Sequence, residues 1–420
     1  MADIKPFQAY RPGQGLEDKI AALPYDVYNR EEATLEVKRN PMSFLSIDRA
    51  ETLFPKEVDT YADVVYQKAR ERLMEYIEKG YFVKDEKECY YLYELVMNGR
   101  SQTGIVACAS IDDYLNNVIK KHENTREDKE LDRIRHVDTC NMQTGPIFLA
   151  YRRNPVLKET IGKIQATKPA CAFQSEDGIL HRVWVIENTD DIRSITEAFA
   201  ATDSIYIADG HHRCASAVKV GLKRRQAWDS REAEYFLSVL FSEDELMIMD
   251  YNRFVKDLNG NTAEQFLQKI AEVAKVEKLQ GNLQNSSDAE SIKPSKKGTM
   301  SMYLAGQWYR LTIKEEFLTT DPVMGLDVSL LQNLVLEPIL GIQNPKTDKR
   351  IDFIGGIRGL KELEKRCEMQ GDNDSVAFAM YPTSIQELFS VADAGKLMPP
   401  KSTWFEPKLR SGLFIHSLEA

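Results

Sequence analysis

The chain has 420 residues, and its 55 Lys and Arg against 65 Asp and Glu give a formal net charge of −10. Hydrophobic residues make up 43% and charged residues 29%, so the chain can bury a sizeable core and is neither disordered nor a coiled coil. The acidic balance argues against a protein that coats nucleic acid, because neutralising phosphates requires an excess of Lys and Arg. It still allows a local basic pocket for a small phosphorylated ligand.

The cysteines and the apolar runs indicate a cytoplasmic protein. No two of the six cysteines are spaced as CxxC, so zinc-ligand and thioredoxin signatures are absent, and scattered cysteines are typical of reduced thiols. No run approaches the roughly 18 apolar residues that span a bilayer. The first residues lack the basic and apolar regions of a signal peptide. We therefore expect a cytoplasmic chain with no membrane partner.

Helices and strands alternate through the first 255 residues. The patterns predict, in chain order, helices over 29–39 and 59–79, a hairpin over 89–110 with its turn at Asn98-Gly99, a helix from 111, a strand over 145–151, a helix over 154–166, a strand over 178–186, a helix over 189–201, a strand over 204–208, a helix from 214 and a strand over 236–241. This alternation predicts an α+β or α/β architecture.

The composition shifts after Asn259-Gly260. A helix over 262–274, a polar stretch over 280–297 that predicts an exposed loop, and a hairpin over 300–313 indicate an inserted subdomain. We therefore expect three regions: an N-terminal α/β region over 1–255 with its catalytic core at about 100–255, an inserted α/β subdomain over 256–318, and a C-terminal α/β region over 319–420 that packs back on the core.

The strongest functional signal is a strand, a glycine turn and a helix start in the sequence Ile207-Ala208-Asp209-Gly210-His211-His212-Arg213. A helix N-terminus offers free N–H groups and a positive dipole end to a phosphate, and Arg213 adds a planar fork for its oxygens. His211 and His212 titrate near neutral pH, and Asp209 could hold Mg²⁺. A polar turn with surface histidines is the minor alternative. A zinc site is disfavoured, because adjacent histidines point to opposite sides.

A second signal is the polar sequence Lys121-His122-Glu123-Asn124-Thr125, followed by Lys129, Arg133 and Arg135. Glu123 fits a general base that takes the proton of a hydroxyl nucleophile, while Lys121, Lys129 or Arg133 could hold substrate charge. A solvated helix face explains such a charge run about equally well. The interruption by His, Glu, Asn and Thr favours a functional role.

Weaker signals leave alternatives open. Tyr25-Asp26 could line a pocket, although turns use the same residues. Lys408 lies in a tail that either packs back on the chain or clamps a ligand. The chain has no P-loop, GxGxxG, GxSxG or protein-kinase motif.

The motifs carry a resemblance to a known superfamily. The turn at 208–213 resembles the phosphate-binding motif of the ParB/sulfiredoxin-like superfamily, and the chain resembles its long bacterial ParB/SpoOJ-like branch. The shared features are Pro24-Tyr25-Asp26-Val27, Lys121-His122-Glu123 with Thr125, the 208–213 turn, and Met398-Pro399-Pro400-Lys401-Ser402-Thr403 with Phe405, Pro407 and Lys408. The resemblance covers most of residues 5–416 and implies a ParB/sulfiredoxin-like mixed sheet with helices.

Free L-serine kinases in that superfamily carry a similar turn and an upstream glutamate that activates the serine hydroxyl. The resemblance therefore implies a kinase that makes O-phosphoserine with Mg²⁺, from pyrophosphate or from ADP or ATP. The lack of an obvious adenine pocket favours pyrophosphate. The implied residues are Glu123 and His122 for catalysis, Asp209, Gly210, His211, His212 and Arg213 for the donor phosphates, Lys121, Thr125, Lys129 and Arg133 as substrate or phosphate contacts, and Asp209 for the metal ion.

Two other classes of function stay open. A nucleotide-switched, DNA-associated ParB-like protein would need a helix-turn-helix and a basic face, and neither is evident after Ala217. A regulator that binds a phosphorylated ligand without turnover would need only the turn. Basic residues gathered at 120–135 and 211–213 on an acidic chain match a pocket for a small anion, so we expect no nucleic-acid partner. The sequence leaves the oligomeric state open.

Overall fold

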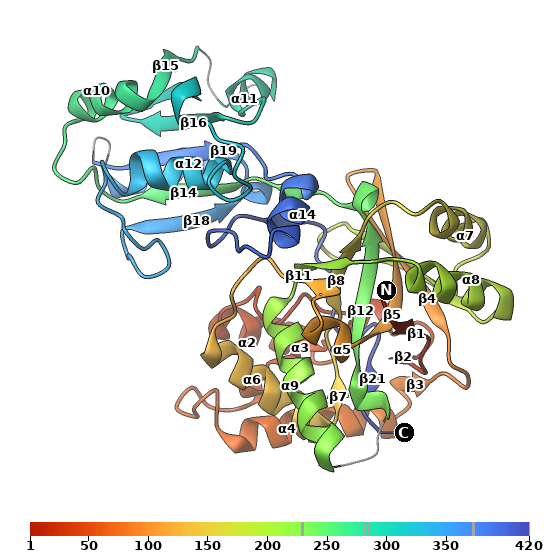
Figure 1. Ribbon diagram of the computed structural model, residues 1–420. Coiled ribbons are helices and arrows are strands. Elements are labelled where there is room, and N and C mark those ends of the chain that lie inside the picture. Colours follow the sequence, from red (N-terminus) through yellow and green to blue (C-terminus); the bar gives the residue numbers. More distant parts are fainter. Residues whose placement is uncertain (228–230, 281–282, 284–285, 372–373, 420) are drawn as a thin grey trace. The chain divides into compact units, whose positions relative to one another are not determined.

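The computed structural model describes residues 1–420 apart from 228–230, 281–282, 284–285, 372–373 and 420. The chain forms two compact units (Figure 1). The first comprises Met1–Leu246 and Pro407–Ala420, and the second comprises Met247–Glu406. The chain therefore leaves the first unit, builds the second, and returns to the first for its last segment.

A mixed sheet lies at the centre of the first unit. Its strands follow the order β6 (Ile119–Lys120), β11 (Ile205–Asp209), β8 (Ile147–Tyr151), β12 (Tyr235–Ser242), β5 (Arg100–Ser110), β4 (Tyr90–Met97), β10 (Leu180–Ile186) and β9 (Cys171–Gln174), and β1 (Ile4–Lys5) pairs with β5. β6 runs parallel to β11, and β12 runs parallel to β8. The other neighbours are antiparallel. This mixed sheet with helices confirms the predicted α+β fold.

The hairpin of β4 and β5 follows from its turn residues, as predicted. Asn98 and Gly99 have positive φ angles of 51° and 79°, which fit the type I′ turn that matches the twist of paired strands. The turn sets the register, with Met97 opposite Arg100. Residues 102–110 of β5 are all buried, which is typical of a central strand covered on both faces.

Helices of the first unit pack on this sheet and fix its polar edge. They are α5 (Ile111–Leu115), α7 (Pro155–Gln165), α8 (Thr189–Ala200) and α9 (His211–Ala227). Their apolar residues join the strands in one core, whose fully buried members include Leu92, Ile105, Leu149, Phe199 and Leu240. Full burial of one such side chain contributes about 1.5–3 kcal/mol. The core thereby holds the end of β11 and the start of α9 in place.

A second core lies among helices built from the N-terminal residues and from residues 127–140. Its elements are α1 (Glu17–Ile20), α2 (Arg30–Arg39), α3 (Leu45–Asp48), η1 (Ala50–Leu53), α4 (Asp63–Glu78) and α6 (Glu127–Cys140), together with the paired strands β2 (Tyr10–Pro12) and β3 (Phe82–Lys84). α2 starts where predicted, because Asn29 and Glu32 form a capping box. α6 is absent from the sequence-based prediction, since its buried residues include the polar Asp132, Arg133 and His136.

The return segment, Pro407–Ala420, is built into the first unit. Its strand β21 (His416–Ser417) pairs with β7 (Met142–Gln143). Ser411 exchanges two backbone hydrogen bonds with Ala22, with N···O distances of 3.1 and 2.9 Å. Residues 409–418 are buried. The return segment is thus a fixed part of the first unit.

The second unit is built on an antiparallel sheet. Its strands follow the order β15 (Ala274–Lys278), β17 (Gln307–Ile313), β16 (Thr299–Leu304), β19 (Val376–Met380), β14 (Tyr251–Val255) and β18 (Ile351–Gly355). Its further elements are α10 (Ala263–Val273), α11 (Ser286–Ile292), α12 (Asp327–Leu331), α13 (Leu360–Gln370), α14 (Ile385–Asp393) and the pair β13 (Ile248–Met249) and β20 (Trp404–Phe405). The predicted hairpin over 300–313 corresponds to β16 and β17.

The division of the chain differs from the predicted one. Residues 256–318 do not form a subdomain of their own, because β16 and β17 share one sheet with β14, β18 and β19. Of the expected C-terminal region over 319–420, only Pro407–Ala420 belongs to the first unit. Part of the loop predicted over 280–297 lies outside the described residues, and Ser286–Ile292 forms α11.

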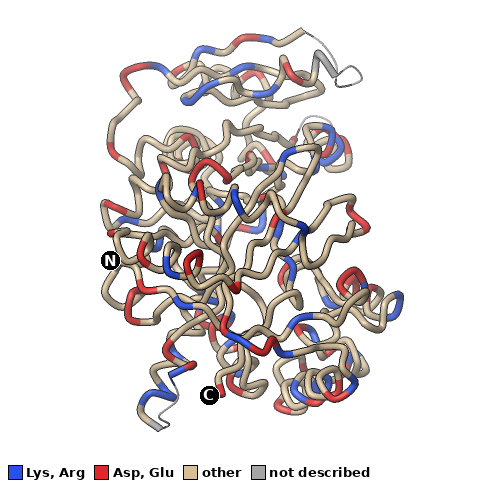
Figure 2. Tube along the Cα trace, turned by 90° about the vertical axis from the view of Figure 1, so that its right-hand side faces the viewer, with Lys and Arg blue, Asp and Glu red and all other residues tan. Residues whose placement is uncertain are grey.

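Charges of both signs mix along the chain. Lys and Arg are interspersed with Asp and Glu along the traces of both units (Figure 2). Many exposed charges pair locally, as Lys79 does with Glu75 at 2.6 Å, and such a pair contributes at most about 1 kcal/mol. Among the helices of the described residues, none combines the length and the apolar character needed to cross a membrane.

Candidate functional site

The candidate phosphate turn, residues 209–213, lies between β11 and α9, as the strand, turn and helix pattern predicts. Gly210 has a φ of +91°, where side chains with a Cβ are strained, and a Cβ there would lie 3.1 Å from Nε and Nη2 of Arg213. The Gly210 N–H donates to Oδ1 of Asp209 at 2.8 Å. Gly210 therefore lets the chain turn sharply and lets the Arg213 side chain lie against the backbone.

Two cations surround the carboxylate of Asp209. Nζ of Lys408, from the return segment, lies 3.2 Å from Oδ2 of Asp209. Burial favours the neutral acid, but Lys408 and Arg213 outweigh it and lower the pKa of Asp209 below its usual range. Because the Asp209 side chain is still 36% exposed, it presents an ionised carboxylate to solvent.

Arg213 is held in one orientation. Its Nη1 donates to the carbonyl oxygen of Pro146 at 2.6 Å, and a Cβ on Gly145 would lie 3.6 Å from the same nitrogen. Arg213 also lines a small cavity of about 30 Å³, whose wall includes Tyr25 and Arg133. The guanidinium is therefore preorganised, which reduces the entropy lost when it binds an anion.

A pair of parallel strands brings the second polar stretch to this turn. Ile119 of β6 lies opposite Ile205 of β11, and Lys120 lies opposite Tyr206. Because the two strands are parallel, the chain leaves both at the same end of the sheet, so the site loop, residues 121–126, lies beside the phosphate turn. This is the edge at which α/β proteins commonly bind ligands. Glu123, in the middle of the site loop, is half-buried, and Lys121 is exposed.

The site loop and α9 meet through their histidines. The N–H of His122 donates to Nε2 of His211 at 3.4 Å, and the two rings lie 4.5 Å apart at an angle of 87°. The N–H of Arg126 donates to Nε2 of His212 at 3.0 Å. Since both Nε2 atoms accept hydrogen bonds, His211 and His212 are neutral and carry their proton on Nδ1.

Burial accounts for the charge state of these rings. It lowers the pKa of His122 to about 4 and the pKa of His211 well below its ordinary value. His122 is 2% exposed, and neither of its ring nitrogens has a hydrogen-bond partner among the described residues. His211 and His212, which the sequence allowed to be charged or neutral, are therefore neutral, and Arg213 and Lys408 are cations of the described residues at the turn.

Thr125 and the start of α6 fasten the site loop to α9. The Thr125 hydroxyl donates to Glu130, and Lys219 of α9 forms an ion pair with the same carboxylate. Ser216 donates to the carbonyl oxygens of His212 at 2.7 Å and of Glu130 at 3.1 Å. Thr125 thus supports the loop, and its expected contact with the substrate stays a prediction.

Lys129 and Arg133 belong to α6 and not to the turn or the site loop. Both line a cavity of about 310 Å³ in the first unit. The small cavity beside Arg213 shares Tyr25, Asp48, Arg133 and His136 with this larger one. The predicted residues thus divide between the phosphate turn with its loop and a neighbouring cavity.

Several residues of this region carried little or no signal in the sequence. Lys408 lies 199 residues from Asp209. Asp26 follows the turn-like Pro24-Tyr25, and Asp132 lies inside a run of charged residues. The tail sequence that ends in Lys408 was the one indication of a role for that residue.

The chain is similar to one protein family and to several solved structures. A family model described as "Protein of unknown function (DUF1015)" matches residues 4–329. No curated protein matches the sequence significantly. The similar solved structures include a free serine kinase in complex with AMP, which is 16% identical at a TM-score of 0.33 and matches over 72% of this chain and 86% of that one.

Two further structures show comparable similarity. A conserved hypothetical protein from Pyrococcus furiosus is 16% identical at a TM-score of 0.32, over 73% of this chain and 93% of that one. SbnI with a C-terminal truncation, from Staphylococcus aureus, is 9% identical at a TM-score of 0.36, over 72% and 82%.

Proposed function

The chain belongs to the DUF1015 family, and we propose that it is a small-molecule kinase that phosphorylates the hydroxyl of free L-serine. The observation that carries the proposal is the parallel pairing of β6 with β11, which sets the loop of Glu123 beside the turn of Asp209 and Arg213. A phosphoryl transfer needs a base for the acceptor hydroxyl next to a preorganised phosphate site. The motif resemblance described above points to the same pair of segments.

The donor phosphates are assigned to the turn. The N-terminus of α9, which is 17 residues long, supplies N–H groups and a positive dipole end. Arg213 and Lys408 supply the cationic charge, while His211 and His212 offer one Nδ1–H each. We favour pyrophosphate as the donor, with ADP or ATP as alternatives. Pyrophosphate needs only such a charged cradle, whereas a nucleotide also needs a surface for its base.

The Asp209 carboxylate is suited to serve as the one protein ligand of a Mg²⁺ ion. Its carboxylate is ionised and partly exposed, and each oxygen accepts one hydrogen bond, from Gly210 or Lys408, which leaves a further lone pair on each. Mg²⁺ typically takes one or two carboxylates and completes its shell with substrate phosphates and water. When bound, the ion would neutralise charge on the donor phosphates.

Glu123 is assigned as the base. In the proposed step the serine oxygen attacks the donor phosphorus and its proton passes to Glu123. The bond from that phosphorus to the bridging oxygen then breaks, so that serine and pyrophosphate give O-phosphoserine and orthophosphate. His122 is assigned as a positioning residue, because its buried ring is neutral and its N–H contacts His211.

The DNA-associated alternative is disfavoured by the partners of the basic residues on α9. Lys219 pairs with Glu130, Lys223 with Asp138 at 2.5 Å, and Arg225 with Asp112 at 2.8 Å. Cations that are already paired gain less from a DNA backbone, because binding must break the existing contacts. This helix therefore does not present a basic track.

The experiment is to incubate the protein with Mg²⁺ and L-serine together with pyrophosphate, ADP or ATP, and to detect phosphoserine by mass spectrometry. We expect product with pyrophosphate. Glu123→Gln should reduce turnover by at least about a hundredfold, as expected for a lost general base, and should leave donor binding intact. No product with any donor would overturn the proposal. Donor binding without product would favour the regulatory alternative.

A further inference from the structure

The cavity that Lys129 and Arg133 line has a charged wall that the phosphate turn does not explain. Its volume is about 310 Å³, which is at the lower end of the range for small-ligand pockets. α6 contributes Lys129, Asp132, Arg133 and His136, whose spacing of three and four residues places them on one helix face. The opposite walls come from the loop before α2, from η1 and from α4.

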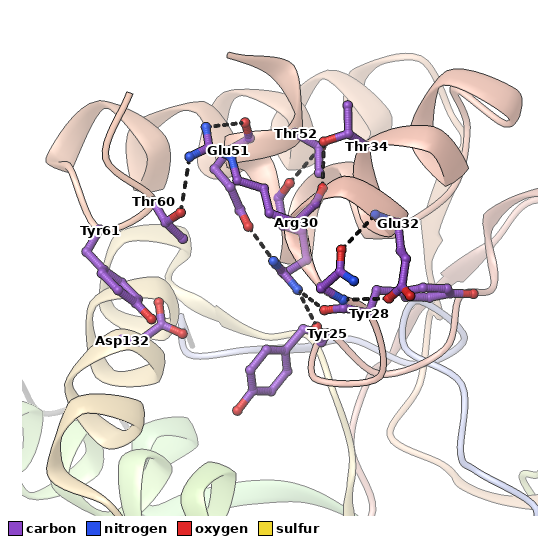
Figure 3. A network of polar contacts seen from close by, with 12 residues as sticks. Tyr25, Tyr28, Arg30, Glu32, Thr34, Glu51, Thr52, Thr60, Tyr61 and Asp132 are labelled. Atoms are coloured by element: carbon purple, nitrogen blue, oxygen red, sulfur yellow. Dashed lines mark hydrogen bonds and ion pairs between the residues drawn. The ribbon is translucent and has the colours of Figure 1, made fainter. Parts of the chain in front are cut away.

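The loop before α2 is held rigidly at this cavity. Nη1 of Arg49 donates to the carbonyl oxygens of Tyr25 at 2.9 Å and of Tyr28 at 2.7 Å. Arg30 donates to the carbonyl oxygens of Val58 at 2.9 Å and Pro55 at 3.0 Å. Figure 3 shows Arg30 together with residues of the cavity wall, which include Tyr25, Tyr28, Glu51, Thr60, Tyr61 and Asp132. The wall is therefore preformed by contacts within the protein.

Four of the charged groups in the wall form two ion pairs, and Asp48 has a neutral hydrogen-bond partner. Arg133 pairs with Asp132 at 2.9 Å and lies 4.0 Å from the Tyr25 ring centre. Arg49 pairs with Glu51 at 2.6 Å. Asp48 accepts a hydrogen bond from the Thr144 hydroxyl at 2.9 Å.

Lys129 and Asp26 differ from these matched groups. Within the described residues, neither side chain makes a hydrogen bond or an ion pair, and both line the same cavity. The wall as a whole has four carboxylates, Asp26, Asp48, Glu51 and Asp132, against three cations, Arg49, Lys129 and Arg133. An excess of acid disfavours a polyanion such as the donor. Lys129 and Asp26 are the two charged groups of the wall with neither a hydrogen bond nor an ion pair among the described residues, and one group of each sign suits a molecule that carries both charges.

We propose that this cavity binds the acceptor as a free, zwitterionic amino acid, with Lys129 contacting its carboxylate and Asp26 contacting its ammonium group. The inference rests on the proposed kinase function. Since the cavity shares Tyr25 and Arg133 with the small cavity beside Arg213, an acceptor held there adjoins the phosphate turn. Asp26 also acts electrostatically on His212, raising the pKa that burial lowers, which places it near the turn.

The test uses acceptors that lack one charge. Glycerate has a carboxylate and a hydroxyl but no ammonium group, and ethanolamine has an ammonium group and a hydroxyl but no carboxylate. Lys129→Met should raise the KM for serine about tenfold or more and should not affect ethanolamine. Asp26→Asn should raise the KM for serine similarly and should not affect glycerate. A charge-assisted hydrogen bond of about 1.5 kcal/mol corresponds to this tenfold change.

Lys158→Met and Asp203→Asn, two exposed residues of the first unit outside the cavity wall, are the matched controls and should keep the wild-type KM. Calorimetric titration of L-serine into each protein without donor supplies a second, independent readout. Phosphoserine formation with an unchanged KM in both cavity variants would overturn the inference and leave the kinase function standing. Serine binding that depends on Lys129 and Asp26, without product from any donor, would support the cavity as a serine site and overturn the kinase function. If serine neither binds nor reacts, both fail.

Discussion

Nζ of Lys408 lies 3.2 Å from Oδ2 of Asp209, although 199 residues separate them. The contact joins the return segment to the end of β11. Lys408 and Arg213 together keep the Asp209 carboxylate ionised despite its burial. The phosphate turn is therefore complete only after the chain has come back from the second unit.

Replacing Lys408 with Met should weaken donor binding. The substitution removes a cation from the turn and leaves the negative charge of Asp209 less compensated, so the site repels a phosphate more strongly. We expect the KM for pyrophosphate to rise about tenfold or more, because hydrogen bonds to charged groups contribute about 1.5–3 kcal/mol. Steady-state kinetics at fixed serine measure the change. Lys361→Met, at an exposed position on α13 of the second unit, is the control, and equal effects of the two variants would contradict the role of Lys408.

Gly210→Ala should damage the turn in two separable ways. A φ of +91° costs an Ala residue about 1–2 kcal/mol of stability, and the added Cβ would meet the Arg213 guanidinium at 3.1 Å. Gly99 has a φ of +79° and no atom within 4 Å of the place that a Cβ would take, so Gly99→Ala isolates the first effect. We expect both Ala variants to lose stability in denaturant unfolding and only Gly210→Ala to lose donor binding. If Gly210→Ala still binds the donor, Arg213 does not contribute to the donor site.

Local signals in the sequence account for the elements that were predicted correctly. Asn98-Gly99 sets a hairpin turn, and Asn29 with Glu32 caps α2, because these residues determine the backbone within a few positions of themselves. The turn at 209–213 is also local, as a strand end, a glycine and a helix start. The two candidate segments could therefore be found separately from the sequence.

The sequence could not show that the site loop and the turn at 209–213 lie side by side. The site loop reaches the turn through β6, whose two residues pair with β11 across 86 positions, and so short a strand leaves no period in the sequence. α6 was missed because its buried face carries Asp132, Arg133 and His136, so polar residues occupy the positions where the helical pattern expects apolar ones. The unit boundaries depend on which strands share a sheet, which composition does not encode.

Asp132→Asn should be the most destabilising single change at the cavity. The side chains of Asp132 and Arg133 are only 9% and 8% exposed, and Asp132 also accepts from the Tyr66 hydroxyl at 2.9 Å. Removing the negative charge leaves a buried guanidinium uncompensated, which typically costs about 3–5 kcal/mol. Urea unfolding measures the loss.

Asp128→Asn is the matched comparison for that change. Asp128 is also on α6, but it pairs with Arg126 on the surface at 2.8 Å, with side chains 53% and 67% exposed. Such a pair contributes about 1 kcal/mol or less. A similar loss of unfolding free energy in both variants would show that the buried pair does not stabilise the fold more than the surface pair.

Glu232 makes the stability of the first unit depend on pH. Its carboxylate lies 2.6 Å from Nζ of Lys5 and 2.8 Å from Nε2 of His416 in the return segment. Burial raises the pKa of Glu232, but the contacts with His416 and Lys5 outweigh it and lower the pKa from 4.5 to about 2. A lowered carboxylate pKa stabilises the fold above pH 4.5, and this contribution is lost as the pH falls from 4.5 to about 2.

Glu232→Gln should therefore reduce the free energy of unfolding by about 2 kcal/mol at pH 7, since each pKa unit corresponds to about 1.4 kcal/mol and solvent screens part of this half-buried cluster. The difference between wild type and variant should shrink below pH 4.5 and approach zero near pH 2, as wild-type Glu232 takes up a proton in both states. Urea unfolding at a series of pH values measures it. Glu234→Gln, which breaks a more exposed pair with Arg225 at 3.0 Å, should lower stability by less than about 1 kcal/mol. A wild-type-to-Glu232→Gln difference that stays constant from pH 7 to about pH 2 would mean that the contacts of Glu232 with Lys5 and His416 do not set the acid sensitivity of the unit.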